Sequence, residues 1–241
     1  MRTMNKYPEV VSRLEGLGKQ MANRLDLDLS HRITFAASTS YTDMDGETVD
    51  VSTGETTTTA LADSTHDLRG TTTTYRNILA NNPRLSKGAL EGMERLMAEE
   101  TLNQFGEKVT MPFDILFTTD DPNTINTARE YLQSTADVEG AHSGIVNVYA
   151  SKYRHVILPR VATDANGIPS STYRYYWGIA SSAYSTLYLG VWEEPHLKMP
   201  ADLNAGEDFA TDDWNFGSRA GYGICVVNAA WIKISKGDGS S

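Results

Sequence analysis

The sequence predicts an α+β fold, because segments with helical spacing and segments with strand spacing follow one another along the chain. In some segments apolar residues recur three and four positions apart, as on one face of a helix, and in others they alternate with polar residues, as in a strand. With 241 residues, of which 40% are hydrophobic, the chain is long enough to bury a sizeable core. Near its end, residues 222–232 carry no charge before Lys233, which predicts a long strand buried on both faces.

The first expected element is a helix over residues 8–25. Gly16 and Gly18 weaken it, since each costs about 1 kcal/mol relative to alanine. The apolar residues that share one face of this helix are Val10, Leu14, Leu17, Met21 and Leu25.

Residues 33–51 change to a period of two, which predicts a β-hairpin. Its turn is Asp45-Gly46, a pair that tolerates positive φ. A polar hairpin of this length is marginal alone in water, so it is expected to lie on another subunit or on the body of its own chain, with an ordinary surface loop as the alternative. The residues expected to make a contact between subunits are Phe35, Tyr41, Asp45, Gly46, Val49 and Val51.

Two further helices are expected in the middle of the chain. Ser86 predicts the start of a long helix that runs to about Phe105, with Gly106 as its stop. Asp121-Pro122 predicts the start of another, after an extended segment over residues 109–118. Later strands are expected over residues 145–150, 155–161, 173–180 and 187–192, followed by a polar loop over 195–213.

The formal net charge of −10 argues against a protein whose main task is to grip phosphates, since such proteins carry basic patches. Cys225, the single cysteine, lies in the apolar stretch and is expected to be a small hydrophobe rather than a catalytic thiol. No run approaches the roughly 18 apolar residues that cross a bilayer, and the start lacks the apolar core of a secretory signal. We therefore expect no membrane contact and synthesis in a cytoplasm.

No motif in the sequence nominates an enzyme, a metal site or a cofactor. The motifs of a nucleophile elbow, a phosphate-binding loop and a dinucleotide-binding turn are missing, and the histidines lack metal-ligand spacing. Residues 43–47 resemble part of a calcium loop, but a hairpin turn explains them better. The acidic pairs Asp120-Asp121 and Asp212-Asp213 suit helix caps or turns. The aromatic residues between 173 and 192 are expected to pack in the core or at an interface.

Three passages of the sequence are distinctive enough to be compared with those of known protein families. They are residues 65–70 (Thr-His-Asp-Leu-Arg-Gly) with Tyr75-Arg76-Asn77, residues 113–130, and residues 144–149. In their order, with a short N-terminal arm, a hairpin, a long helix and a closing strand around them, they resemble the major capsid proteins of tailed bacteriophages, in the branch of Mu-like head subunits. The resemblance spans roughly residues 30–234.

The resemblance implies the phage major capsid fold of the Hong Kong type, with a peripheral and an axial domain. Its expected parts are an N-terminal arm and helix (1–32), an extended hairpin loop with the return to the peripheral domain (33–80), the spine helix of that domain (81–108), the axial domain (109–205), and a C-terminal strand that returns to the peripheral domain (206–241).

The resemblance also implies a function. The protein would be a structural subunit that self-assembles into pentamers and hexamers of an icosahedral shell, which encloses double-stranded DNA without reading its sequence. Further partners would be scaffolding, portal and cement proteins, and the location would be the virion capsid after synthesis in the cytoplasm of the bacterial host. The alternatives are a shell protein of a bacterial nanocompartment with the same fold, and an unrelated α+β enzyme, which would need a cleft with perturbed acids or a metal.

Overall fold

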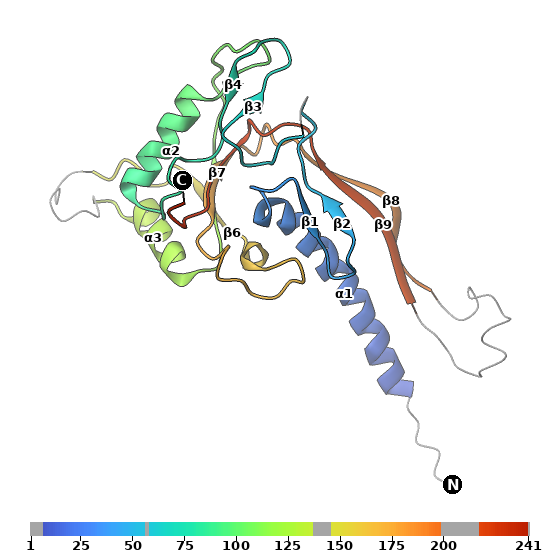
Figure 1. Ribbon diagram of the computed structural model, residues 1–241. Coiled ribbons are helices and arrows are strands. Elements are labelled where there is room, and N and C mark those ends of the chain that lie inside the picture. The colour runs from blue at the N-terminus through green and yellow to red at the C-terminus, as the bar shows by residue number, and fades with distance from the viewer. Residues whose placement is uncertain (1–6, 56–57, 137–145, 199–216, 241) are drawn as a thin grey trace, which may run out of the picture. The chain divides into compact units, whose positions relative to one another are not determined.

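The computed structural model describes residues 7–55, 58–136, 146–198 and 217–240 and confirms the α+β class (Figure 1). Contacts divide the chain into two compact units, each assembled from segments that are distant in the sequence. Unit 1 joins residues 1–29 to 189–224, and unit 2 joins residues 30–188 to 225–241. The five-part division into arm, loop, spine helix, axial domain and closing strand stays a prediction.

A four-stranded sheet forms the centre of unit 2. Its strands are β5 (Ile115–Thr118), β6 (Arg154–Ile157), β7 (Trp177–Ala180) and β10 (Ile232–Ser235), in the order β10-β7-β5-β6. β5 and β6 are parallel, and α3 (Pro122–Gln133) lies in the crossover between them. β7 pairs antiparallel with both β5 and β10, so the last strand of the chain closes one edge of the sheet.

Both faces of this sheet are covered, as the full burial of β7 and β10 requires. One face packs against α3 and α2 (Lys87–Glu99), while loop segments and the end of β9 cover the other. The helix-covered face includes Leu90, Met93, Leu116, Ala128, Trp177 and Ile179. The opposite face includes Leu61, Phe117, Val226, Ala229, Ile232 and Ile234.

The helix that Ser86 caps is shorter than predicted. The Ser86 hydroxyl accepts a hydrogen bond in the first turn, which confirms the N-cap, but α2 ends at Glu99 rather than near Phe105. Beyond α2 the chain turns, because Asn103 Oδ1 accepts the backbone N–H of Phe105 at 2.9 Å. Gly106, with φ of 83°, serves this turn rather than the helix end.

The helix predicted after Asp121 is confirmed as α3. Asp121 is its N-cap, and Oδ2 accepts the backbone N–H of Thr124 at 3.0 Å. The extended segment predicted before it, 109–118, forms a strand only in its second half, β5.

The first helix, α1 (Tyr7–Thr34), is longer than the predicted one. It includes Ile33, which the alternating pattern had placed in a strand. The buried hydroxyl of Thr34 donates to the carbonyl of Val161 at 2.9 Å. This contact across 127 positions holds the last turn in place, and local spacing cannot reveal it.

The predicted hairpin exists, but its strands are short. β1 (Ser40–Thr42) and β2 (Thr48–Asp50) pair antiparallel over three residues each. Asp43 Oδ1 accepts the backbone N–H of Asp45 at 3.0 Å within the turn. Gly46 has φ of 84°, which confirms the turn chemistry expected for Asp-Gly.

The long closing strand was a wrong prediction, because the apolar stretch is divided between two sheets. β9 (Gly217–Val226) pairs with β8 (Leu187–Lys198), and Figure 1 shows the two strands running side by side. The chain then turns at 227–231, where Asn228 Oδ1 accepts the N–H of Ala230 at 3.3 Å, before β10 begins. Cys225 is exposed rather than buried, since β9 belongs to a two-stranded sheet.

The remaining strand predictions hold in part. Within 145–150, the described residues form an isolated bridge from Val146 to Ala136 and then a turn, not a strand. The segment 155–161 is divided between β6 and a 3-10 helix (Pro159–Ala162). Only the end of 173–180 is a strand, β7, whereas the strand expected at 187–192 extends through β8 to Lys198.

Two shorter strands complete the described elements. β3 (His66–Asp67) and β4 (Thr74–Tyr75) pair antiparallel over two residues each. Of the polar loop predicted over 195–213, the first residues belong to β8, and residues 199–213, with the pair Asp212-Asp213, lie outside the described residues.

A substitution at Gly178 on β7 tests how closely the central sheet is packed. A Cβ at this position would overlap the carbonyl oxygen of Lys233 and the ring of Phe117. Gly178→Ala is therefore expected to lower the free energy of unfolding by about 2–3 kcal/mol, measured by urea denaturation. Gly88→Ala is the matched control, because the space around Gly88 is open, and its stability should be unchanged or slightly raised. Equal urea midpoints for the two variants would contradict the close approach of Gly178 to the Lys233 carbonyl and the Phe117 ring.

Candidate functional site

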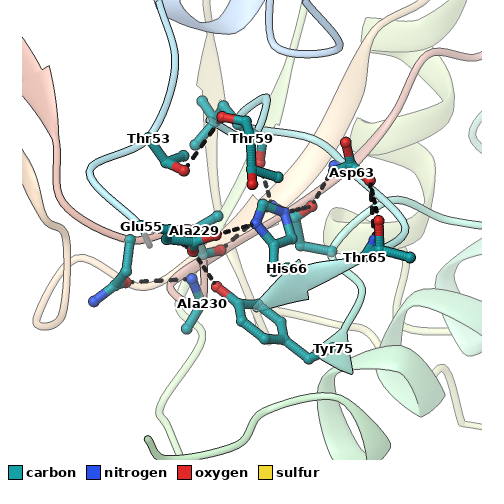
Figure 2. Close-up of polar contacts among 12 residues, drawn as sticks. Thr53, Glu55, Thr59, Asp63, Thr65, His66, Tyr75, Ala229 and Ala230 are labelled. Carbon is teal, nitrogen blue, oxygen red and sulfur yellow. Dashed lines mark hydrogen bonds and ion pairs between the residues drawn. The ribbon is translucent and has the colours of Figure 1, made fainter. Parts of the chain in front are cut away.

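A buried polar group in unit 2, which we call the Glu55 cluster, consists of Glu55, His66, Tyr75 and Asn77. Glu55 Oε2 lies 2.7 Å from His66 Nδ1, and the Tyr75 hydroxyl donates to Glu55 Oε1 at 2.8 Å. The backbone N–H of Ala229 donates to the same Oε1 at 3.3 Å. Figure 2 shows His66 and Tyr75, from β3 and β4, together with Glu55 and Ala229. The cluster thus joins the β3–β4 pair to the segment that precedes β10.

Asn77 determines how the protons of the cluster are arranged. Its Nδ2 donates to the carbonyl oxygens of Leu61 at 2.5 Å and Ala229 at 3.4 Å, and its Oδ1 accepts the N–H of Asp63 at 2.9 Å. Oδ1 also lies 2.9 Å from His66 Nε2, so this ring nitrogen must be the donor. Both nitrogens of the fully buried His66 ring are occupied, which suits structural support rather than general acid–base catalysis.

Lys233 on β10 is a fully buried lysine. Its Nζ donates to the carbonyl oxygens of Arg76 at 3.3 Å and Glu100 at 3.0 Å, and lies 5.3 Å from the centre of the Tyr75 ring. Burial lowers the pKa of Lys233 to about 7, although the Glu100 carboxylate acts to raise it, and the Arg76 guanidinium lowers it further. Lys233 therefore connects the last strand to the chain after β4 and to the end of α2.

A second polar pair lies between β5 and β6, where Thr118 Oγ1 and His155 Nε2 are 2.9 Å apart. A hydroxyl beside an imidazole is one arrangement of an activated nucleophile. Burial lowers the pKa of His155, and the charge of Arg129 adds to this effect. Thr118 is fully buried, however, so a substrate has no path to its hydroxyl, and the pair is explained as a contact between strands.

The sheet of β8 and β9, which we call the ribbon, exposes large apolar side chains in unit 1. Trp192 on β8 is 74% exposed, and Val191 beside it is 50% exposed. The indole lies over Gly221 of β9, where an added Cβ would overlap the ring. Complete burial of this side chain would contribute on the order of 3 kcal/mol, so the ribbon has the character of an interaction surface.

Polar contacts within unit 1 support the ribbon. The Tyr222 hydroxyl donates to Asp28 Oδ2 at 2.5 Å, which links β9 to α1. Arg24 Nε lies 3.0 Å from Asp28 Oδ1. Arg219 Nε lies 2.9 Å from Glu193 Oε2, so this ion pair joins the two strands of the ribbon.

A pocket with a volume of about 390 Å³ opens beside α2 in unit 2, and we call it the α2 pocket. At its edge, Glu94 Oε1 accepts from Lys152 Nζ at 2.6 Å and from the Tyr153 hydroxyl at 2.7 Å. Burial, followed by the hydrogen bond to Glu94, raises the pKa of Tyr153. The other residues that line it include Met97, Ala98, Lys108, Val109, Met111 and Phe113. The pocket is therefore mixed in character, with thioether and aromatic side chains next to a carboxylate, a hydroxyl and two lysines.

The structure separates the six predicted hairpin residues into two groups. Tyr41 stacks on Phe35 with ring centres 4.4 Å apart, and both rings meet His31 edge-on. Val51 is buried too, so these side chains are used within their own chain. The more accessible group, at or beside the turn, consists of Asp45, Gly46 and Val49. The contact between subunits stays a prediction, and these last residues are the ones available for it.

The sequence holds a signal for only part of this site. Lys233 stands between Ile232 and Ile234 in a chain-ending apolar segment, which marks it as a lysine at a buried position. The pairing of His66 with Glu55 depends on how the chain folds back over 11 positions, and the position of Trp192 over Gly221 depends on the register of the ribbon. Spacing alone indicates neither.

Comparison with known proteins does not assign the chain to a family. A scan against protein-family models finds no match, and a search of the curated proteins finds no similar sequence. In the described part of the chain, no group of three or more His, Cys, Asp or Glu side chains is placed to hold a metal ion. Among the described helices, none has the length and apolar character to cross a membrane. The ribbon and the α2 pocket are the exposed features of the described structure that bear on function.

The Glu55 cluster predicts a loss of stability when its carboxylate is removed. Glu55→Gln leaves His66 facing an amide in place of a charged acceptor, so we expect the free energy of unfolding to fall by about 3 kcal/mol in urea denaturation at pH 7. Glu91→Gln, at an exposed position on α2, is the matched control and should change it little. If the two variants unfold at the same urea concentration, the cluster does not hold these segments together.

The lowered pKa of Lys233 predicts that the free energy of unfolding rises with pH above neutrality. Its pKa is about 7 in the folded state and about 10.4 in the unfolded chain, so the unfolded state binds more protons between these values. The free energy of unfolding should therefore rise by on the order of 3 kcal/mol from pH 7 to pH 10. Above about pH 10 it should fall, because burial raises the pKa values of Tyr75 and Tyr153.

Lys233→Met tests this dependence, since it removes the titrating group. Denaturation curves of the variant between pH 7 and 9 should show a clearly smaller slope of stability against pH. Lys19→Met, at an exposed position on α1, should retain the slope of the wild-type chain. An unchanged slope in Lys233→Met would show that another group causes the dependence.

Proposed function

We propose that this chain is a shell-forming subunit, the major capsid protein of a tailed phage or prophage, which assembles with copies of itself around double-stranded DNA. The proposal rests on the composition of unit 1. This unit combines most of the 28-residue helix α1 with a ribbon that exposes Trp192. A two-stranded ribbon is marginal by itself in water, and a helix obtains most of its stability from packing. Copies that cover one another supply the missing contacts.

The interior of unit 2 supports a structural role. Its interior polar groups, the Glu55 cluster and Lys233, are hydrogen-bonded to other parts of the same chain. Their contacts join segments near residues 55, 77 and 100 to the chain end. A body stiffened in this way suits a subunit that must keep its shape while contacts form at its surface.

Under this proposal, the parts of the capsid fold are assigned differently from the expectation in the sequence. The spine helix would be α1, with 28 residues, rather than α2, with 13. Unit 1 would be the peripheral domain and unit 2 the axial domain. The hairpin of β1 and β2 has strands of three residues, so it is too short for a far-reaching extended loop.

The charge of the chain suits a container for DNA. A formal charge of −10 disfavours tight contact with phosphates, so DNA would be enclosed without being gripped.

Repetition would provide the strength of such a shell. Each contact between neighbouring copies can be modest, because closing the shell makes every further contact intramolecular. Scaffolding, portal and cement proteins as partners, and a location in the virion, belong to the same proposal.

The first test is negative-stain electron microscopy of the purified protein after size fractionation. Closed particles, or rings of five and six copies, are expected in the high-mass fractions, since the exposed surfaces of unit 1 drive association. Phe105→Ser tests whether any exposed apolar side chain would drive association. Phe105 is 62% exposed on the turn after α2, outside unit 1, so this variant should assemble like the wild type. A protein that stays monomeric at high concentration and with a crowding agent would contradict the proposal, as would a bound substrate-like ligand found by native mass spectrometry.

A further inference from the structure

We propose that Trp192 of one copy docks into the α2 pocket of a second copy, with Glu194 of the first beside Lys108 of the second. This inference rests on the proposed function and names the contact by which copies join. It accounts for two features that the single chain leaves exposed, an indole on the ribbon and a partly apolar pocket beside α2.

The pocket is of a suitable size and composition for an indole. Its volume of about 390 Å³ lies at the lower end of the roughly 300–1,000 Å³ range of pockets that enclose small organic molecules. Met97 and Met111 in its lining offer thioether contacts, which adapt to the edge of an aromatic ring. Phe113 offers an aromatic partner for the indole. Tryptophan is also among the residue types that most often anchor protein interfaces.

The charges beside the two surfaces are opposite. Glu194 follows Trp192 by two positions on β8, so the two side chains are on the same face of the strand. Lys108 lines the α2 pocket. Lys152 lines it too, but Glu94 of the same chain already lies 2.6 Å from its Nζ. Glu194 and Lys108 are therefore the pair that would orient the docked tryptophan.

Trp192 belongs to unit 1 and the α2 pocket to unit 2, so the contact joins two different surfaces. Such a heterologous contact lets every copy donate one tryptophan and accept another. Used head to tail, the contact does not stop at a dimer and forms a ring when its rotation closes, whereas a reciprocal exchange of the two tryptophans would stop at a two-fold dimer. This property fits a subunit that builds capsomers.

The size of the contact fits a repeated array better than a permanent pair. A ribbon of 12-residue and 10-residue strands is about 35–40 Å long, and one face, about 10 Å wide, offers on the order of 400 Å². A standard stable interface buries about 800 Å² per partner. The isolated contact should thus be weak and become strong only through repetition.

Disulfide trapping between two differently substituted chains tests the contact directly. One chain carries Glu194→Cys and the other Lys108→Cys, both with Cys225→Ser to remove the native thiol. Mixed and oxidised, they should form a covalent heterodimer, because the proposal places these positions side by side. As the control, Glu194→Cys is mixed with Glu91→Cys, an exposed position on α2 that does not line the pocket, and should give little product. No excess of the 194–108 product over this control would overturn the inference.

Sedimentation and electron microscopy of further variants test how much the contact between Trp192 and the α2 pocket contributes to assembly. Trp192→Ala, and Ala98→Trp, which fills the pocket from an exposed position, should each weaken self-association by about 30-fold or more with unchanged circular dichroism. Glu194→Lys and Lys108→Glu should each weaken it, and the double variant should recover most of the loss. Wild-type association in Trp192→Ala, or a double charge variant no better than its parents, would contradict the docking.

The two proposals fail in different ways. Closed shells from both wild type and Trp192→Ala, without the 194–108 disulfide, would leave the capsid function standing and remove this contact. A specific 194–108 disulfide in a protein that forms only open filaments would support the contact and remove the closed shell.

Discussion

The pairing of the last strand, β10, at the edge of the central sheet fixes the path that the second half of the chain must take. After β7 the chain must leave unit 2, form β8 and β9, and come back so that Ile232–Ser235 pair with Trp177–Ala180. The ribbon is therefore anchored at its base, where the Thr186 hydroxyl donates to the carbonyl of Asn228 at 2.8 Å. The same return places Lys233 in the interior, and its burial is the cost of closing the sheet with a charged residue.

The interior and the surface of the protein then have separate tasks. Inside, Glu55, Asn77 and Lys233 use their polar atoms to join segments far apart in the sequence, so a loss of any one partner leaves a buried group unsatisfied. Outside, Trp192 and the α2 pocket leave apolar area in contact with water. A protein with uncovered apolar surfaces of this kind is physically suited to association with copies of itself, which is the function proposed for the chain.

Local sequence chemistry predicted the starts and turns of elements better than their ends. Ser86 and Asp121 cap helices, and Gly46 adopts positive φ, because each depends on hydrogen bonds or sterics within a few residues. The end of α1 at Thr34 was missed, since a hydrogen bond to the distant Val161 holds it. The apolar stretch before Lys233 was mistaken for one strand, because spacing does not show which sheet each half joins.

Residue types and their spacing were enough to predict the α+β class, the helix caps, the Asp-Gly turn and a net charge unsuited to gripping phosphates, because these depend on local periodicity, backbone preference or composition. The contact of His66 with Glu55, the burial of Lys233 among backbone carbonyls and the position of the exposed Trp192 over Gly221 emerge only once the chain is folded. These arrangements depend on contacts between residues far apart in the chain or on the register of paired strands. Their energies come from burial and desolvation, which a linear pattern of residue types does not contain.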